Sequence, residues 1–209
     1  MKISILGAGH VGQALARAFV RVGQPVVLGV PDPTRYTDAV SALGPLATLT
    51  TANSATTQGD LVILAVPYAA ALMVAQGYPD WQGRVLVDAT NPIAPGLAGL
   101  LVGTTTSGAE QIAERAQGAR VVKAFNTTGA ENMADSRYER GPIMMPVASD
   151  DADARQQVMS LATLIGFEAV DFGALRAARY LEPLAMAWIH LAFKQGQGRR
   201  FAFSRVTRP

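Results

Sequence analysis

The stretch MKISILGAGHVGQALARA, residues 1–18, decides the fold. A short apolar run at residues 2–6 is typical of a buried strand, and three glycines follow it with G-x-G-x-x-G spacing. Apolar residues then recur at the spacing of a helix, at Val11, Ala14, Leu15, Ala18 and Phe19. A strand, a tight turn and a helix N-terminus in direct succession indicate a dinucleotide-binding site.

Each glycine has its own role in such a site. The first permits the sharp turn, the second lets the backbone approach a pyrophosphate, and the third lets the helix pack closely on the strand. The N–H groups at the start of the helix then face the phosphate. The alternatives are a glycine-rich turn without a ligand and, for His10, a solvated turn residue. We expect the whole motif to border the cofactor, namely Gly7, Ala8, Gly9, His10, Val11 and Gly12.

The composition limits the class of protein. The 209 residues fit one domain or one domain with a small appendage, and an apolar content of 49% supports a large core. The absence of cysteine excludes disulfides and thiolate chemistry, and two distant histidines make a zinc site unexpected. No apolar run reaches about 18 residues and no leader pattern is present, so we expect a cytoplasmic protein without a membrane partner.

The end of the chain is locally basic, although the net charge is only +2. A solvated tail explains this charge, and the alternative is attraction to an anionic cofactor or substrate. No basic stripe interleaves with aromatic residues, so a nucleic-acid partner is not expected. The basic residues are Lys194, Arg199, Arg200, Arg205 and Arg208.

Strand and helix patterns alternate along the remaining chain, which predicts an α/β fold with a doubly wound parallel sheet of Rossmann type. We expect a dinucleotide-binding domain over residues 1–160 and a small C-terminal strand and helical lobe over residues 161–209, packed into one compact unit. Short apolar runs predict strands at residues 24–30, 47–49, 61–66, 84–89, 119–124, 143–148 and 168–171. Helices are expected at residues 36–43, 53–58, 68–76, 107–117, 152–165 and 174–195.

The residues that follow each strand form the candidate site, because ligands of open α/β sheets bind at the carboxyl ends of the strands. Short polar side chains suited to hydrogen bonds with a ribose or a carboxamide dominate there. No Ser-His-Asp or His–carboxylate arrangement and no compact acid/base group is present, which favours hydride transfer over hydrolysis. These segments are residues 66–68, 90–92 and 125–128.

The end of the second strand bears on the choice between NAD and NADP. In this fold an acid at that place binds the ribose 2′-OH of NAD, whereas an arginine accommodates the 2′-phosphate of NADP. Asp32 lies at the right sequence distance from the glycines to be the acid, and Arg35 suits a phosphate. The sequence is therefore compatible with either NAD or NADP.

Two further ionisable residues have alternative interpretations. Lys123, inside the sixth strand, either lies near an electron acceptor or pairs with a carboxylate or reaches solvent; pairing or solvent is favoured, because lysine is almost never buried unpaired. His190, in the last helix, is expected to pack against its neighbours rather than to serve as an acid or base.

Five segments together resemble the coenzyme F420-dependent type of NADPH oxidoreductase. The oxidoreductase domains of six-transmembrane metalloreductases, which use flavin and reduce iron, are similar. The segments are KISILGAGHVG at residues 2–12, AVP at 65–67, DATNP at 88–92, VVKAFNTTGAENM at 121–133 and DFGALRAARYLEPLAMAWIHLA at 171–192.

This resemblance implies a reductase in which NADPH lies along the strand ends and a flavin or deazaflavin stacks over its nicotinamide. Relatives often carry Ser or Arg directly after the glycine of the second strand, where this chain has Val30 and Pro31. Thr34 and Arg35 are therefore expected to hold the 2′-phosphate. The residues implied to face the ribose and nicotinamide are Ala65, Val66, Pro67, Asn91, Pro92, Phe125 and Asn126.

Three functions follow, since a fold does not fix a function. The leading one is hydride transfer between NAD(P)H and a flavin or deazaflavin, a small-molecule acceptor. The others are an imine or hydroxy-acid reductase with Lys123 as proton donor, and a non-catalytic dinucleotide sensor. A homodimer through the last helix is a further expectation, because that helix carries apolar residues at Leu181, Leu184, Trp188 and Leu191.

Overall fold

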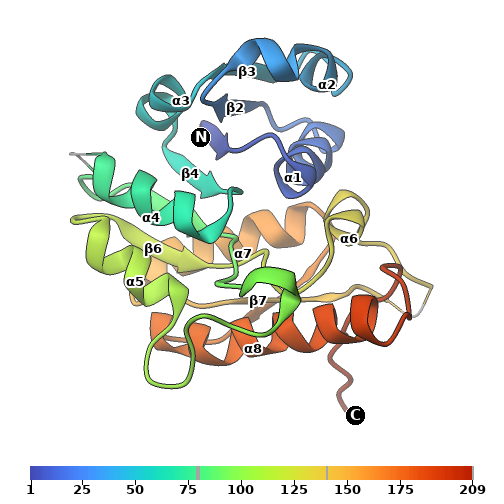
Figure 1. Cartoon of the computed structure of the whole chain (residues 1–209). Helices are drawn as coiled ribbons and strands as arrows, with labels where there is room; N and C mark the ends of the chain where they lie inside the picture. The colour runs from blue at the N-terminus through green and yellow to red at the C-terminus, as the bar shows by residue number, and fades with distance from the viewer. Residues whose placement is uncertain (79–80, 140, 209) are drawn as a thin grey trace.

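A parallel sheet of six strands forms the centre of the fold (Figure 1). The computed structural model describes residues 1–78, 81–139 and 141–208. The spatial order β3-β2-β1-β4-β5-β6 is that of a doubly wound dinucleotide-binding sheet, so the predicted fold class is confirmed. The strands are β1 (Ile3–Leu6), β2 (Val26–Val30), β3 (Ala47–Thr51), β4 (Leu61–Leu64), β5 (Val85–Asp88) and β6 (Arg120–Lys123).

Helices connect these strands and continue beyond them. The expected helices are present with small shifts at their ends, and the short helix α6 was not expected. Three-residue or four-residue 3₁₀ turns, η1 (Pro33–Tyr36), η2 (Pro95–Leu97) and η3 (Leu175–Ala177), lie in the connections. The helices are α1 (His10–Arg21), α2 (Thr37–Ser41), α3 (Ala52–Gln58), α4 (Tyr68–Gly77), α5 (Gly108–Arg115), α6 (Ala130–Ala134), α7 (Ala152–Leu164) and α8 (Ala178–Ile189).

Alternate side chains of each strand cover the two faces of the sheet. Ile3 and Ile5 of β1 belong to a core shared with α1 and α7. Leu6, Val62 and Leu64 belong to a second core shared with α3, α4 and α5. Burial on both faces explains why the strands read as continuous apolar runs rather than as alternating ones.

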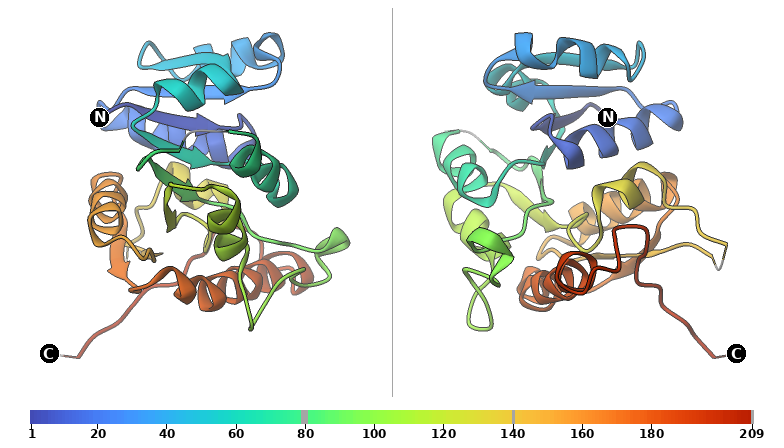
Figure 2. Two further views of the ribbon diagram at one scale, coloured as in Figure 1. Left: turned by 90° about the vertical axis from the view of Figure 1, so that its left-hand side faces the viewer. Right: turned by 45° about the vertical axis from the view of Figure 1, so that its right-hand side comes forward.

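The last two strands, β7 (Met144–Val147) and β8 (Glu168–Asp171), pair with one another in a separate two-stranded sheet. A single antiparallel bridge between Lys123 and Ala148 joins this sheet to the end of β6. Helix α8 lies on the β6 side of the molecule, opposite β3 (Figure 2). The end of the chain extends outward from α8. The division into residues 1–160 and 161–209 stays a prediction.

The helix expected over residues 174–195 is divided into η3, α8 and a π-helical segment, His190–Lys194. Its side chains differ from the expectations at two places. His190 is exposed and contacts Gln195, rather than packing against the lobe. Leu181 and Trp188 are buried within their own chain, so they are not available to a second copy; the ring of Trp188 stacks on Phe201 from the returning C-terminal segment.

Side chains cap the starts of α5 and α7. The Ser107 hydroxyl accepts a hydrogen bond from the Glu110 N–H at 3.1 Å and donates one to the Glu110 carboxylate at 2.7 Å. At α7 the cap is Asp151, whose carboxylate accepts from the Ala154 N–H. Asp150 instead accepts from the N–H of Leu175 and ties η3 to the start of α7.

The backbone at the start of α1 lies in close contact with the backbone at the ends of β1 and β4. A Cβ atom at Gly12 would overlap the carbonyl oxygen of Gly7, and one at Gly7 would overlap the carbonyl oxygen of Ala65. Gly7 also has φ +106°, a left-handed conformation that disfavours other residues. Both glycines are therefore required by the packing of the protein itself.

We expect Gly12→Ala to destabilise the protein by about 3 kcal/mol or more, because the added methyl group meets a carbonyl oxygen that no rotamer change can move away. Chemical denaturation would measure the loss. Gly77→Ala is the matched control, because a Cβ at Gly77 meets no atom within 4 Å. Equal stability of the two variants would contradict the assigned contact.

Candidate functional site

The middle glycine of the motif differs from the other two. Gly9 is exposed, its φ is −76°, and a Cβ built on it has no neighbour within 4 Å. Nothing in the fold therefore requires glycine here, and any residue could adopt this backbone conformation. What glycine does provide is open access to the backbone from outside.

The start of α1 presents its N–H groups to this open space. Gly9 is the N-cap residue, no side chain caps the helix, and no acidic residue lies in its first turn. The first N–H groups of a helix lack partners within the helix, and they carry the positive end of its dipole. The Gln13 side chain stabilises the turn by donating a hydrogen bond to the carbonyl oxygen of Ala8 at 2.7 Å. The turn has the form of an anion cradle.

The loop after β2 separates the two candidates for ribose recognition. The Asp32 carboxylate accepts from the N–H of Thr34 at 3.1 Å and from its hydroxyl at 2.6 Å, and so caps η1. Arg35 is exposed, and no ion pair of its guanidinium is found among the described residues. Asp32 thus has a local structural role, whereas Arg35 is available to an anion.

The ends of β4, β5 and β6 bring together most of the other predicted residues. Ala65 lies against the glycine turn and its N–H donates to the carbonyl oxygen of Leu6. Asn91 and Asn126 bind one another: the Asn91 amide donates to the Asn126 backbone oxygen at 2.9 Å, and the Asn126 amide donates to Asn91 Oδ1 at 3.0 Å. Asn126 is 4% exposed and its own Oδ1 has no partner among the described residues.

Phe125 lies at this place in the chain, but its side chain does not reach the surface. The ring is fully buried with its centroid 6.3 Å from that of Phe167, and the backbone N–H contacts Met145 Sδ. Its φ of +57° is unusual for a bulky residue, and such strain persists only where the surroundings impose it. Only the backbone of Phe125 can face a ligand. Pro92 is likewise buried.

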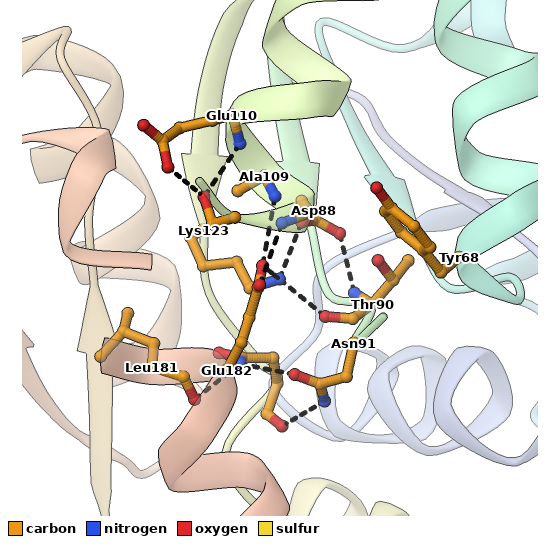
Figure 3. Close-up of polar contacts among 12 residues, drawn as sticks. Tyr68, Asp88, Thr90, Asn91, Ala109, Glu110, Lys123, Leu181 and Glu182 are labelled. Carbon is orange, nitrogen blue, oxygen red and sulfur yellow. Dashed lines mark hydrogen bonds and ion pairs between the residues drawn. The ribbon is translucent and has the colours of Figure 1, made fainter. Parts of the chain in front are cut away.

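A buried ion network lies directly beneath these strand ends (Figure 3). The Lys123 ammonium donates to Asp88 at 2.8 Å, to Glu182 at 2.9 Å and to the carbonyl oxygen of Thr90 at 2.7 Å. All three charged side chains are at most 1% exposed. Each of the three ammonium protons therefore has an acceptor.

The carboxylates of this network are also satisfied by backbone groups. Glu182 accepts from the N–H groups of Gly108 and Ala109 at the start of α5, and Asp88 accepts from the N–H of Thr90. Burial by itself lowers the pKa of Lys123, but the two carboxylates outweigh it and the pKa is raised. The lysine therefore stays charged, and the N-terminus of α5 offsets the second negative charge.

The prediction that Lys123 pairs with a carboxylate is confirmed. The expectation that no compact group of acids and bases lies near the strand ends was wrong. Asp88 and Glu182 were missed. A signal for each is present in the sequence: Asp88 ends an apolar strand, and Glu182 is the only acidic residue between 172 and 195. An acid in an apolar element indicates a buried partner.

No group of His, Asp and Glu side chains in residues 1–78, 81–139 and 141–208 is arranged to hold a metal ion. None of the helices in that part of the chain has the length and apolar character needed to span a bilayer.

Comparison with known proteins places this geometry in a family. Residues 2–92 match the family described as NADP oxidoreductase, coenzyme F420-dependent. The chain is 32% identical over 212 residues to the F420-dependent NADP reductase of Methanothermobacter marburgensis, covering 93% of each protein.

Two further relatives support this assignment. A solved structure of a proposed F420-dependent NADP-reductase from Arthrobacter sp. FB24 is 31% identical, with a TM-score of 0.86 over 99% of this chain and all of the other. The metalloreductase STEAP3 of Rattus norvegicus is 29% identical over 188 residues, which are 88% of this chain and 36% of that protein.

We expect Lys123→Met to destabilise the protein by about 3–5 kcal/mol, because it leaves two buried carboxylates without their cation. Denaturant unfolding would measure this loss. The double variant Asp88→Asn/Lys123→Met should lose less, since one uncompensated charge is removed with the lysine.

The control for this prediction is Arg137→Met, which breaks the exposed Arg137–Asp135 pair and should leave stability unchanged. A lysine variant as stable as this control would show that the buried network contributes nothing.

Proposed function

Because the chain belongs to the coenzyme F420-dependent NADP oxidoreductase family, we propose that it transfers a hydride between NADPH and a deazaflavin of the F420 type. The observation that carries the proposal is the open space at Gly9. Packing explains Gly7 and Gly12 but does not explain a glycine at position 9, where a group approaching from outside would need the backbone uncovered. A diphosphate at the start of a helix is such a group.

Different residues of the site would bind different parts of the nucleotide. The N–H groups of residues 8–12 would hold the pyrophosphate, since that of Gly7 donates to the carbonyl oxygen of Gly29. Arg35 would bind the 2′-phosphate, with Thr34 beside it. Asn91 and Asn126 would face the nicotinamide end. The unpartnered Oδ1 of Asn126 supports this place, since a buried acceptor left without a donor costs about 1–3 kcal/mol.

Hydride transfer suits a site that lacks a proton donor. When bound, the two cofactors supply the hydride donor and the hydride acceptor, and the protein has to orient them and exclude water. Residues 65–67, 90–92 and 124–128 contain no ionisable side chain. The imine or hydroxy-acid reductase alternative would depend on Lys123, whose three protons are engaged beneath the surface.

Tyr68 is the nearest other donor along the chain, and it is also engaged. Its hydroxyl donates to Gln111 at 2.8 Å, and burial followed by the charge of Glu182 raises its pKa. The phenol therefore stays protonated and supports α5 instead of acting as a base. This arrangement favours a redox reaction in which the chain itself exchanges no proton.

We expect Gly9→Val to raise the dissociation constant for NADPH at least about 100-fold, which corresponds to about 2.8 kcal/mol, because its side chain fills the place of the diphosphate. The free energy of unfolding should change by less than about 1 kcal/mol, since a Cβ at this position has no neighbour within 4 Å. Titration of nicotinamide fluorescence measures the first effect and denaturation the second.

The wild-type protein should also oxidise NADPH when coenzyme F420 is added. The loss of nicotinamide absorbance measures this oxidation. FMN and ferric chelate are the comparison acceptors, and a non-catalytic sensor would bind NADPH without turnover with any of them. Unchanged NADPH affinity in Gly9→Val, or no turnover with any acceptor, would remove the proposal.

Arg35→Ala should weaken NADPH binding about tenfold and leave NADH binding unchanged, because only NADPH carries the 2′-phosphate that a guanidinium binds by charge-assisted hydrogen bonds. Parallel titrations with both nucleotides supply the control within one variant. Equal losses for the two nucleotides would place the 2′-phosphate elsewhere.

A further inference from the structure

A cavity of about 300 Å³ lies between α1 and α6, beside the glycine turn, and the proposed function does not use it. It begins at His10, in the first turn of α1, and extends to Arg17 on the same face of that helix, two turns further along. Glu131 of α6 and Arg199 of the C-terminal segment complete its polar lining. The cavity therefore continues from the turn proposed for the pyrophosphate.

The lining carries more positive than negative charge. Arg199 forms an ion pair with Glu131 at 3.0 Å, and its Nε is buried without a hydrogen-bond partner in the described structure. Arg17 is exposed at the other end, and none of the ion pairs found among the described residues includes it. One carboxylate thus faces two guanidinium groups.

Arg199 is held in place by its surroundings. Its guanidinium lies 5.6 Å from the ring centroid of Phe193. Two residues later, the carbonyl oxygen of Phe201 accepts from Asn132 of α6 at 2.7 Å and from Trp188 of α8 at 2.8 Å. These bonds bring the basic C-terminal segment back against α6, where Figure 1 and Figure 2 show the two side by side. Arg199, one of the basic residues that the sequence places in a tail, is therefore fixed at a cavity.

We propose that this cavity binds a phosphate group on the side chain of the flavin-type acceptor, an inference that rests on the proposed function. Guanidinium groups are suited to phosphate by charge and by their paired N–H donors. The Arg199 side chain is 38% exposed although it is paired with Glu131, so its guanidinium is open to a second anion. A phosphate here would anchor the acceptor on the α6 side of the glycine turn.

The cavity is distinct from the place proposed for the 2′-phosphate of NADPH. Arg35 follows β2, and Figure 1 shows β2 and α6 on opposite sides of α1. Two phosphates, one on the nucleotide and one on the acceptor, would thus be bound on opposite sides of the same helix. This separation makes the two sources of phosphate distinguishable by experiment.

The test compares FMN with riboflavin, which lacks the phosphate, by quenching of flavin fluorescence on the full chain saturated with NADP⁺. FMN should bind about tenfold more tightly than riboflavin. Arg17→Gln and Arg199→Gln should each reduce FMN affinity toward that of riboflavin and leave riboflavin binding unchanged. Arg176→Gln is the matched control, because Arg176 is an exposed arginine of η3 that lies outside the cavity, and this variant should bind FMN as the wild type does.

Several results would overturn the inference: equal binding of FMN and riboflavin, no binding of either, or an equal effect of Arg176→Gln. A loss of NADP⁺ affinity without a loss of NAD⁺ affinity in Arg17→Gln would overturn it as well, by assigning the cavity to the nucleotide. The proposed function fails separately, through absent NADPH binding or turnover. If NADPH is bound and oxidised normally while FMN shows no advantage, only the phosphate site is wrong.

Discussion

The close contact of α1 with the ends of β1 and β4 is the constraint on which the rest of the site depends. With hydrogen atoms in place of side chains at Gly7 and Gly12, the helix starts directly above the strand ends. Its first N–H groups are thereby directed into open space rather than into the core. The parallel sheet provides a rigid base, because both of its faces are buried beneath helices.

The buried network of Asp88, Lys123 and Glu182 fixes the other end of the site. It links β5, β6, α8 and the start of α5 through one ammonium group. Burying three charges is costly unless every one is paired and hydrogen-bonded, as they are here. The consequence for function is positional: the segments that carry Asn91 and Asn126 are held together just above the network, with hydrogen bonds between them.

Local sequence rules predicted what local physics determines. The glycine turn and the strands each depend on residues a few positions apart, and they are found where expected. The network was missed because its members come together only through the tertiary fold, with 59 positions between Lys123 and Glu182. Periodicity also cannot tell what covers a helix. It places Trp188 on an apolar face suited to a dimer, whereas in the structure the ring of Phe201 from the same chain stacks on Trp188.

The most direct test of the central claim is a crystal structure of the protein with NADPH. Density for the diphosphate should lie against the backbone N–H groups of residues 8–12, within hydrogen-bond distance and over Gly9. Density for the nucleotide at another place, with the glycine turn empty, would contradict the account of why this turn is built as it is.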